Sequence, residues 1–371
     1  MSLKCIFRIS KLGAGGAERV FISIADYLKD IKGSEIIFVV DNNEGKTIDV
    51  VKSKGMRVIP LNVKRSIFSL SKFKVIIDSF QPDIIISAYP DTNGAALLSN
   101  LFSKHKCAIV VTEHSSIKRH WANASIFRRF QVRLIVSLLY RLANKIICVS
   151  DGVRDEVVNL VGRPHMVETI YNPVRFGISK NRSSVPKDRR KIVLAVGRIS
   201  KPKDYSTLIE AFSLLKSTDS LLKIVGTAHD IDEYERLKVL VTQKNLESRI
   251  EFVGYTPSPE DFYETASLFV LSSAWEGFGN VVVEALSFGL PIVSTNCESG
   301  PAEILQDGKF GRLVPVGDFK AMAQAIDDLL MNNPYDKHSQ KNRSLFFSEE
   351  KIGEQYFSMI ERCVKNNRME L

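Results

Sequence analysis

Short apolar runs rich in β-branched residues alternate along this chain with segments of helical periodicity, and they do so in two series. The first series of expected strands is Cys5–Ile9, Glu35–Val40, Arg57–Ile59, Asp83–Ser87, Ala108–Thr112 and Lys145–Val149. The second is Ile192–Val196, Leu222–Val225, Ile250–Val253, Leu268–Leu271 and Pro291–Ser294, with helices such as Tyr205–Leu215 and Glu233–Lys244 between them. Such alternation is typical of βαβ units and predicts parallel sheets.

The two series indicate two Rossmann-like α/β domains, and a chain of 371 residues is long enough for both. We expect an N-terminal domain over residues 1–172, a polar and basic linker over 173–190, and a second domain over 191–350. Residues 351–371 read as a C-terminal helix that packs back on the first domain. Ligands of open parallel sheets bind beyond the carboxyl ends of the strands, so we expect these ends to face an interdomain cleft.

The composition excludes several classes of protein. Hydrophobic residues make up 44% and charged residues 25% of the chain, as in ordinary globular proteins. No apolar run reaches the roughly 18–20 residues that span a bilayer, and the first residues do not resemble a signal peptide. Five widely spaced cysteines predict reduced core residues, and hence a cytoplasmic protein. A net charge of +9 favours an anionic partner.

The segment from Trp275 to Leu286 carries the strongest functional signal. Two carboxylates, Glu276 and Glu284, stand eight residues apart around a glycine-flanked turn that follows an uncharged strand and opens an apolar helix. Asn280 is a good N-cap residue. The backbone N–H groups of residues 278–281 are then expected to form a seat for an anion. The segment therefore predicts a ligand site.

Three further loops follow expected strands. In the first loop, Arg198 follows Gly197, and Lys203 stands five residues after Arg198. Two cations directly after a strand suit a diphosphate. Gly15-Gly16 belongs to a glycine-rich first turn that is neither a GxGxxG nor a phosphate-binding loop with its lysine. His114 follows the strand that ends at Thr112.

These motifs together resemble the retaining, nucleotide-sugar-dependent glycosyltransferases of family 4, which have the GT-B fold. The resemblance rests on the Glu-x7-Glu pair, the Gly-Arg-x4-Lys spacing and the Gly-Gly-Ala-Glu-Arg-Val opening. It implies that Arg198 and Lys203 stabilise the donor diphosphate, that Glu276 holds the hexose and that Glu284 binds the ribose. It implies also that His114 contacts the donor hexose. The residues expected to bind the donor are Gly15, Gly16, Arg198, Lys203, Glu276, Gly277, Phe278, Gly279, Asn280, Val281 and Glu284.

The resemblance implies transfer of a hexose or N-acetylhexosamine, from UDP rather than GDP, with retention of the anomeric configuration. The acceptor is expected to be a glycan or a lipid-linked saccharide in surface polysaccharide or glycolipid biosynthesis. Neither a cofactor nor a metal ion is expected. Asp230-Ile231-Asp232 spells a metal-binding DxD, but it precedes a charged helix and is interpreted as helix capping.

A basic and aromatic stretch indicates contact with an anionic membrane. At helical spacing it carries the residues Lys118, Arg119, Trp121, Arg128, Arg129 and Arg133. Such a surface can lie on acidic lipid, at about 1 kcal/mol per basic residue. The following segment, Leu134 to Leu142, is expected to be core. The alternative is that the basic residues are merely the solvated face of a core helix.

The sequence is compatible with other functions. A GT-B sugar-nucleotide epimerase would share the donor site, and a catalytically silent scaffold that binds a membrane or partner would share the fold. The scaffold is disfavoured because Arg198, Lys203, Glu276 and Glu284 are all present. A dinucleotide-dependent oxidoreductase lacks its GxGxxG, and a nucleic-acid binder lacks any motif beyond charge.

Overall fold

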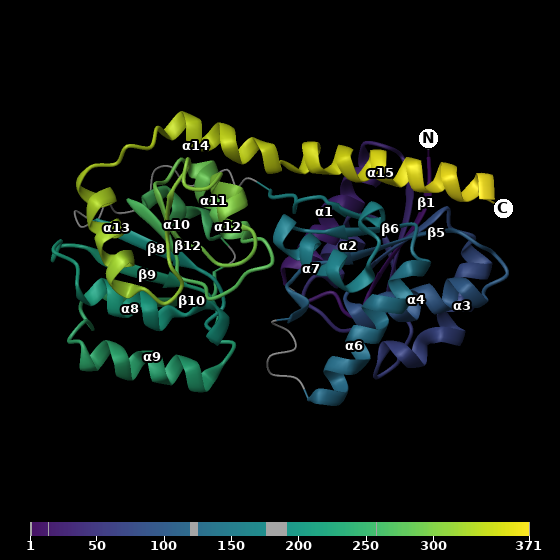
Figure 1. Ribbon diagram of the computed structural model, residues 1–371, viewed down its shortest axis with the longest axis horizontal. Helices are drawn as coiled ribbons and strands as arrows, with labels where there is room; N and C mark the ends of the chain where they lie inside the picture. Colours follow the sequence, from purple (N-terminus) through teal and green to yellow (C-terminus); the bar gives the residue numbers. More distant parts are fainter. Residues whose placement is uncertain (1, 14, 119–124, 176–190, 257, 371) are drawn as a thin grey trace. The chain divides into compact units, whose positions relative to one another are not determined.

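A computed structural model describes residues 2–13, 15–118, 125–175, 191–256 and 258–370. The chain forms two compact units, one of Met1–Pro173 with Glu349–Leu371 and the other of Val174–Ser348. Each is a parallel sheet between layers of helices (Figure 1). Most of the predicted linker, residues 176–190, lies outside the described residues.

The N-terminal unit contains a sheet of seven parallel strands in the order β3-β2-β1-β4-β5-β6-β7. Its strands are β1 (Lys4–Ile9), β2 (Glu35–Val40), β3 (Arg57–Pro60), β4 (Ile84–Ala88), β5 (Ala108–Glu113), β6 (Lys145–Cys148) and β7 (Val167–Thr169). Its helices are α1 (Gly16–Asp30), α2 (Ile48–Ser53), η1 (Ser66–Ser69), α3 (Leu70–Phe80), α4 (Pro90–Phe102), α6 (Ile126–Leu138), η2 (Leu139–Leu142), α7 (Asp151–Val161), η3 (Pro164–Met166) and α15 (Glu349–Glu370).

Strand periodicity divides the core of this unit into two layers. Cys5, Phe7 and Ile9 of β1 pack with α1, α2 and α15, whereas Ile6 packs with α3, α4, α6 and α7 on the other face. The C-terminal helix α15 lies against α1. There the Ser23 hydroxyl donates to a carboxylate oxygen of Glu349 at 2.7 Å. The sheet is thus buried on both faces, as its almost uncharged strands require.

The second unit contains six parallel strands in the order β10-β9-β8-β11-β12-β13. They are β8 (Ile192–Val196), β9 (Leu221–Val225), β10 (Ile250–Gly254), β11 (Leu268–Leu271), β12 (Ile292–Thr295) and β13 (Arg312–Val314). The helices are η4 (Lys201–Lys203), α8 (Tyr205–Ser213), α9 (Ile231–Gln243), α10 (Glu260–Thr265), α11 (Asn280–Phe288), α12 (Pro301–Leu305), α13 (Phe319–Met331), α14 (Lys337–Ser344) and η5 (Leu345–Phe347). The predicted α/β class and parallel sheets are confirmed.

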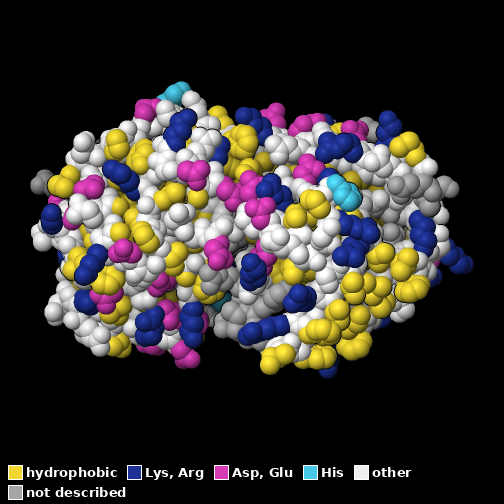
Figure 2. Space-filling view, in the orientation of Figure 1, with side chains coloured by type: hydrophobic (Ala, Val, Ile, Leu, Met, Phe, Trp, Pro, Cys, Tyr) yellow, Lys and Arg dark blue, Asp and Glu magenta, His cyan; other side chains and the backbone are white. Residues whose placement is uncertain are grey.

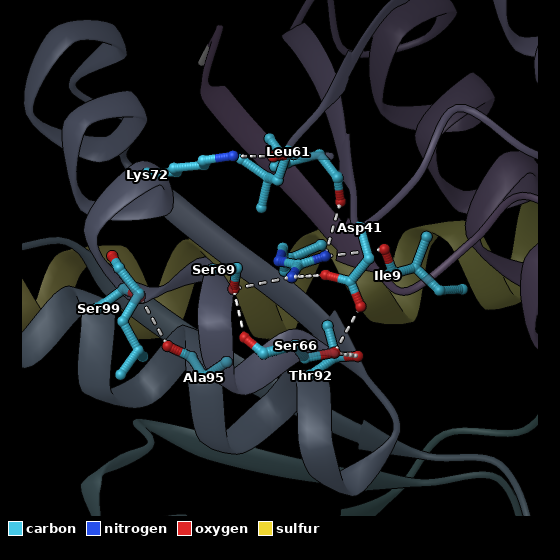
Figure 3. A network of polar contacts seen from close by, with 12 residues as sticks. Ile9, Asp41, Leu61, Ser66, Ser69, Lys72, Thr92, Ala95 and Ser99 are labelled. Atoms are coloured by element: carbon cyan, nitrogen blue, oxygen red, sulfur yellow. Dashed lines mark hydrogen bonds and ion pairs between the residues drawn. The ribbon is translucent and has the colours of Figure 1, made fainter. Parts of the chain in front are cut away.

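A buried ion pair joins the carboxyl ends of β1 and β2. The fully buried guanidinium of Arg8 pairs with the carboxylate of Asp41, and Ser66 donates to the other oxygen of that carboxylate at 2.6 Å. Arg8 also donates to Ile9 O at 2.9 Å and to Ser69 Oγ at 3.2 Å (Figure 3). Burial lowers the pKa of Arg8, and Asp41 opposes that shift. The network therefore anchors η1 to the central strands.

Candidate active site

The order of each sheet reverses at one point, between β1 and β4 in the first unit and between β8 and β11 in the second. Ligands of open parallel sheets bind beyond the strand ends at such a reversal. The loop with Arg198 and Lys203 leaves β8, and the loop with Glu276 leaves β11. The fold therefore places the two predicted cationic and acidic loops on adjacent strands.

Lys203 and Glu276 meet directly. The Lys203 ammonium lies 2.5 Å from Glu276 Oε1, and both side chains are largely buried. Ser273 donates to the same carboxylate oxygen at 2.7 Å. Ser272 Oγ and Ala274 N donate to the carbonyls of Lys203 and Pro202, both at 2.8 Å. The Lys203 ammonium and the Glu276 carboxylate are thus held by the loops after β8 and β11, which hydrogen-bond to each other.

Two glycines allow the β8 and β9 loops to pack closely. Gly226 has φ of +155°, and a Cβ there would lie 1.9 Å from the carbonyl oxygen of Gly197. The buried Tyr205 hydroxyl donates to the same carbonyl at 3.0 Å. The exposed Arg198 directly follows this fixed peptide. Its backbone is therefore set while its guanidinium stays available to a ligand.

Helix α11 begins at the predicted cap itself, one residue earlier than a cap at Asn280 implies. Gly279, with φ of +99°, occupies the N-cap position, and Asn280 is the first helical residue. The prediction that Asn280 caps the helix was wrong, because the turn requires a left-handed backbone that glycine adopts without strain. Phe278 is buried, and its ring stacks edge-on against Phe347 with centroids 5.5 Å apart. Gly277 and Val281 flank this turn.

Glu284 is half-buried on α11, where the buried Tyr263 of α10 donates to its Oε2 at 2.7 Å. Burial and the neighbouring carboxylate raise the pKa of Tyr263, which therefore remains a donor. One oxygen of Glu284 is thereby oriented by the protein. Neither Tyr263 nor Ser273 was identified from the sequence, because neither stands in a motif of fixed spacing.

In the first unit, Gly15 and Gly16 lie at the start of α1, and His114 follows β5. His114 Nε2 lies 2.9 Å from Thr112 Oγ1, and the ring packs edge-on against Phe21. The preceding residue, Glu113, is buried and accepts a hydrogen bond from Tyr140. These contacts fix the end of β5 and with it the position of His114.

The structure describes four of the six residues of the predicted membrane surface. Lys118, Arg129 and Arg133 are exposed, whereas Arg119 and Trp121 lie outside the described residues. Arg128 forms two hydrogen bonds with Asp91 of α4, at 2.7 and 2.5 Å. Its charge is therefore neutralised within the protein and is less available to lipid.

An apolar surface continues along α6 beyond these residues. Ile126, Phe127 and Phe130 are 84%, 78% and 59% exposed. The prediction that Leu134 to Leu142 is core was wrong for every fourth position, since Leu134, Leu138 and Leu142 are exposed while Val136 and Tyr140 are buried. Hydrophobic side chains also gather over α4 and α3 beside α6 (Figure 2).

Two other features concern metals and membranes. Asp230 caps α9 and accepts a hydrogen bond from Glu233 N at 3.0 Å, as the capping interpretation predicted. Among the described residues, no cluster of three or more His, Cys, Asp or Glu side chains could hold a metal ion. Within the same residues, no helix is both long and apolar enough to cross a bilayer.

Comparison with known proteins agrees with this arrangement. The model of Glycosyltransferase Family 4 matches residues 14–176, and that of glycosyl transferases group 1 matches residues 178–344. The N-acetylgalactosamine-N,N'-diacetylbacillosaminyl-diphospho-undecaprenol 4-alpha-N-acetylgalactosaminyltransferase of Campylobacter jejuni is 28% identical over 93% of this chain and 95% of its own. The lipopolysaccharide core biosynthesis glycosyltransferase LpsE of Rhizobium meliloti is 27% identical over 86% of each chain.

Solved structures show the same fold. Anabaena HepE in complex with UDP has a TM-score of 0.82 at 19% identity, over 97% of this chain and 100% of that one. A glycosyltransferase from Rickettsia africae has a TM-score of 0.81 at 19% identity, over 98% and 99%. The predicted GT-B fold is thus confirmed. The chain belongs to the family 4 glycosyltransferases, with the family 4 domain in its N-terminal half and the group 1 domain in its C-terminal half.

Proposed function

We propose that this glycosyltransferase moves a hexose or N-acetylhexosamine from a UDP-sugar to a glycan or lipid-linked saccharide, with retention and without a metal ion. The observation that carries the proposal is the Lys203–Glu276 pair, which joins the loop that carries Arg198 to the loop after β11 at the point where the second sheet reverses its strand order. The HepE structure that contains UDP supports the choice of nucleotide. The name of the Campylobacter relative, with its diphospho-undecaprenol acceptor, supports the lipid-linked saccharide.

Charge development assigns the roles. Cleavage of the bond between sugar C1 and the diphosphate places negative charge on the leaving group. Arg198, Lys203 and the N-terminus of α11 stabilise that charge in place of a metal ion, each fixed donor at roughly 2.7–4 kcal/mol. Glu276 accepts hydrogen bonds from hexose hydroxyls and Glu284 from the ribose.

The apolar and basic surface of α6 would bind an anionic membrane. Phe127 and Phe130 would enter the interface of an anionic leaflet while Arg129 and Arg133 meet its headgroups. A lipid-linked acceptor resides in such a leaflet. The enzyme would therefore work at the cytoplasmic face of a membrane, as a peripheral protein.

The test is transfer from UDP-glucose, UDP-galactose and their N-acetyl forms in EDTA, with undecaprenyl-diphosphate-linked saccharides as acceptors in anionic vesicles or in detergent. We expect an α-linked product from an α-linked donor, by NMR coupling constants. Arg129→Glu with Arg133→Glu is expected to reduce the rate in vesicles and to spare it in detergent. A β-linked product would contradict retention, a strict metal requirement would contradict the charge assignment, and equal loss in both media would contradict the membrane surface.

A further inference from the structure

Three side chains meet where the first sheet reverses its strand order, and no single sequence motif contains all three. Glu18 lies in the first turn of α1, which follows β1; Tyr89 follows β4; and His114 follows β5. Strands β1, β4 and β5 are adjacent in that order. The Tyr89 hydroxyl lies 3.5 Å from Glu18 Oε1, and the rings of Tyr89 and His114 are 6.4 Å apart. The three residues therefore share one small region at the carboxyl edge.

Glu18 is buried, and one of its carboxylate oxygens is unsatisfied by the described residues. The residue is 5% exposed, and Oε2 has no hydrogen-bond partner in the part of the chain that the structure describes. The glycine loop makes room for it, because a Cβ at Gly15 would lie 2.4 Å from Oε2. Burial of a carboxylate oxygen without a hydrogen-bond donor costs folding free energy. Its presence beyond the end of a strand therefore indicates that a ligand supplies the donor.

His114 offers a second unsatisfied acceptor. The Thr112 hydroxyl donates its proton to Ser87 O at 2.9 Å. It must therefore accept from Nε2–H of His114, 2.9 Å away, so that the proton of the ring resides on Nε2. Burial lowers the pKa of His114 to about 4, which keeps the ring neutral. Nδ1 is then an acceptor, and it is buried without a partner among residues 2–13, 15–118, 125–175, 191–256 and 258–370.

The backbone between these acceptors is strained. Tyr89 has φ of +74° and ψ of +138°, a conformation that a bulky residue with a Cβ adopts only when its surroundings impose it. Such strain concentrates at ligand sites. Here the strained residue brings the Tyr89 hydroxyl to Glu18 and the Tyr89 ring to His114.

We propose that Glu18 and His114, with Tyr89 between them, bind two hydroxyls of one saccharide, which donate to Glu18 Oε2 and to His114 Nδ1. This rests on the proposed transfer of a sugar and adds Glu18 as a determinant of saccharide recognition. A ligand that satisfies two acceptors must donate twice, as neighbouring sugar hydroxyls do. A phosphate is disfavoured, because the Glu18 carboxylate lies beneath the same glycine loop and would repel it.

The test compares wild type, Glu18→Gln and the control Glu156→Gln, which alters a buried carboxylate on α7 of the same unit. Two rates are measured with the UDP-hexose that supports the fastest transfer. One is hydrolysis of this donor without acceptor, and the other is transfer of the sugar to the acceptor. We expect Glu18→Gln to lower kcat/KM roughly 10- to 100-fold, since a hydrogen bond to a charged group is lost, with no fall in Tm. The control is expected to keep wild-type rates.

The two rates distinguish the source of the hydroxyls. If the donor sugar occupies the site, Glu18→Gln lowers both rates; if the acceptor does, it lowers transfer alone. In either case, one monodeoxy analogue of that sugar should have a lower kcat/KM than the parent sugar with wild type. With Glu18→Gln, the analogue and the parent sugar should have similar kcat/KM. Unchanged kinetics of Glu18→Gln overturn the inference. A lower activity that accompanies a lower Tm, while every deoxy analogue keeps its wild-type reduction in kcat/KM, overturns it too. A wild type inactive with every nucleotide-sugar overturns instead the proposed function.

Discussion

Replacement of Glu276 by alanine is expected to lower kcat/KM for sugar transfer by about 10²- to 10³-fold, the cost of one preorganised polar group in an active site. The carboxylate is held by Lys203 at 2.5 Å and by Ser273 at 2.7 Å, so it needs no reorganisation when a hexose binds. Its removal deletes the proposed contact with the hexose. It also leaves the largely buried Lys203 ammonium without its partner, so that Lys203 no longer has a fixed position at the proposed diphosphate site.

Two variants make this measurement specific. Glu276→Gln keeps the size and an acceptor oxygen but loses the charge, and we expect it to recover only part of the rate. Glu251→Ala removes an exposed carboxylate on β10 that pairs with Lys223 at 3.3 Å, and it should leave transfer unchanged. Turnover by Glu276→Ala within a few-fold of wild type would remove Glu276 from the site.

Asp41→Ala is expected to lower the free energy of unfolding of the N-terminal unit by about 3–5 kcal/mol, because it leaves a buried guanidinium without its counter-charge. Arg8 is fully buried, and apart from Asp41 its hydrogen-bond partners are neutral oxygens of Ile9, Val39 and Ser69 (Figure 3). These cannot replace a carboxylate. Ser66 would in addition lose the acceptor of its 2.6 Å hydrogen bond.

Denaturant unfolding followed by circular dichroism measures this loss. The exposed pair Arg57–Glu35 is the matched comparison within the same unit, and Glu35→Ala should cost less than about 1 kcal/mol. The double variant Arg8→Met with Asp41→Leu should recover most of the lost stability, because it removes both buried charges. A loss from Asp41→Ala as small as that from Glu35→Ala would show that the Arg8 charge reaches solvent.

The sequence predicted those parts of the fold that depend on long, regular patterns. Mostly apolar runs, three residues long for β3 and four to six for the others, located β1 to β6 and β8 to β12 to within one or two residues. It missed β7 and β13, which have three residues each. A segment as short and as mixed in polarity as these two does not stand out from the surrounding sequence. Pairing of β7 with β6 and of β13 with β12 makes them strands.

The site was predictable where chemistry follows a fixed spacing. The motifs named Lys203 and Glu276, and the structure brings their side chains together. Tyr263 was not predictable, because its contact with Glu284 depends on how α10 packs against α11. The exposed leucines after Leu134 were mistaken for core, since periodicity alone does not say which apolar face of a helix is covered.

Calorimetric titration with UDP and with GDP in EDTA tests the central claim, a metal-independent nucleoside diphosphate site on the second unit, most directly. We expect UDP to bind in preference to GDP and Arg198→Ala to weaken that binding, more at low than at high salt because the contact is exposed. Preference for GDP would contradict the proposed donor. Binding of neither nucleotide without a divalent metal would contradict the claim that Arg198, Lys203 and the start of α11 take the place of the metal.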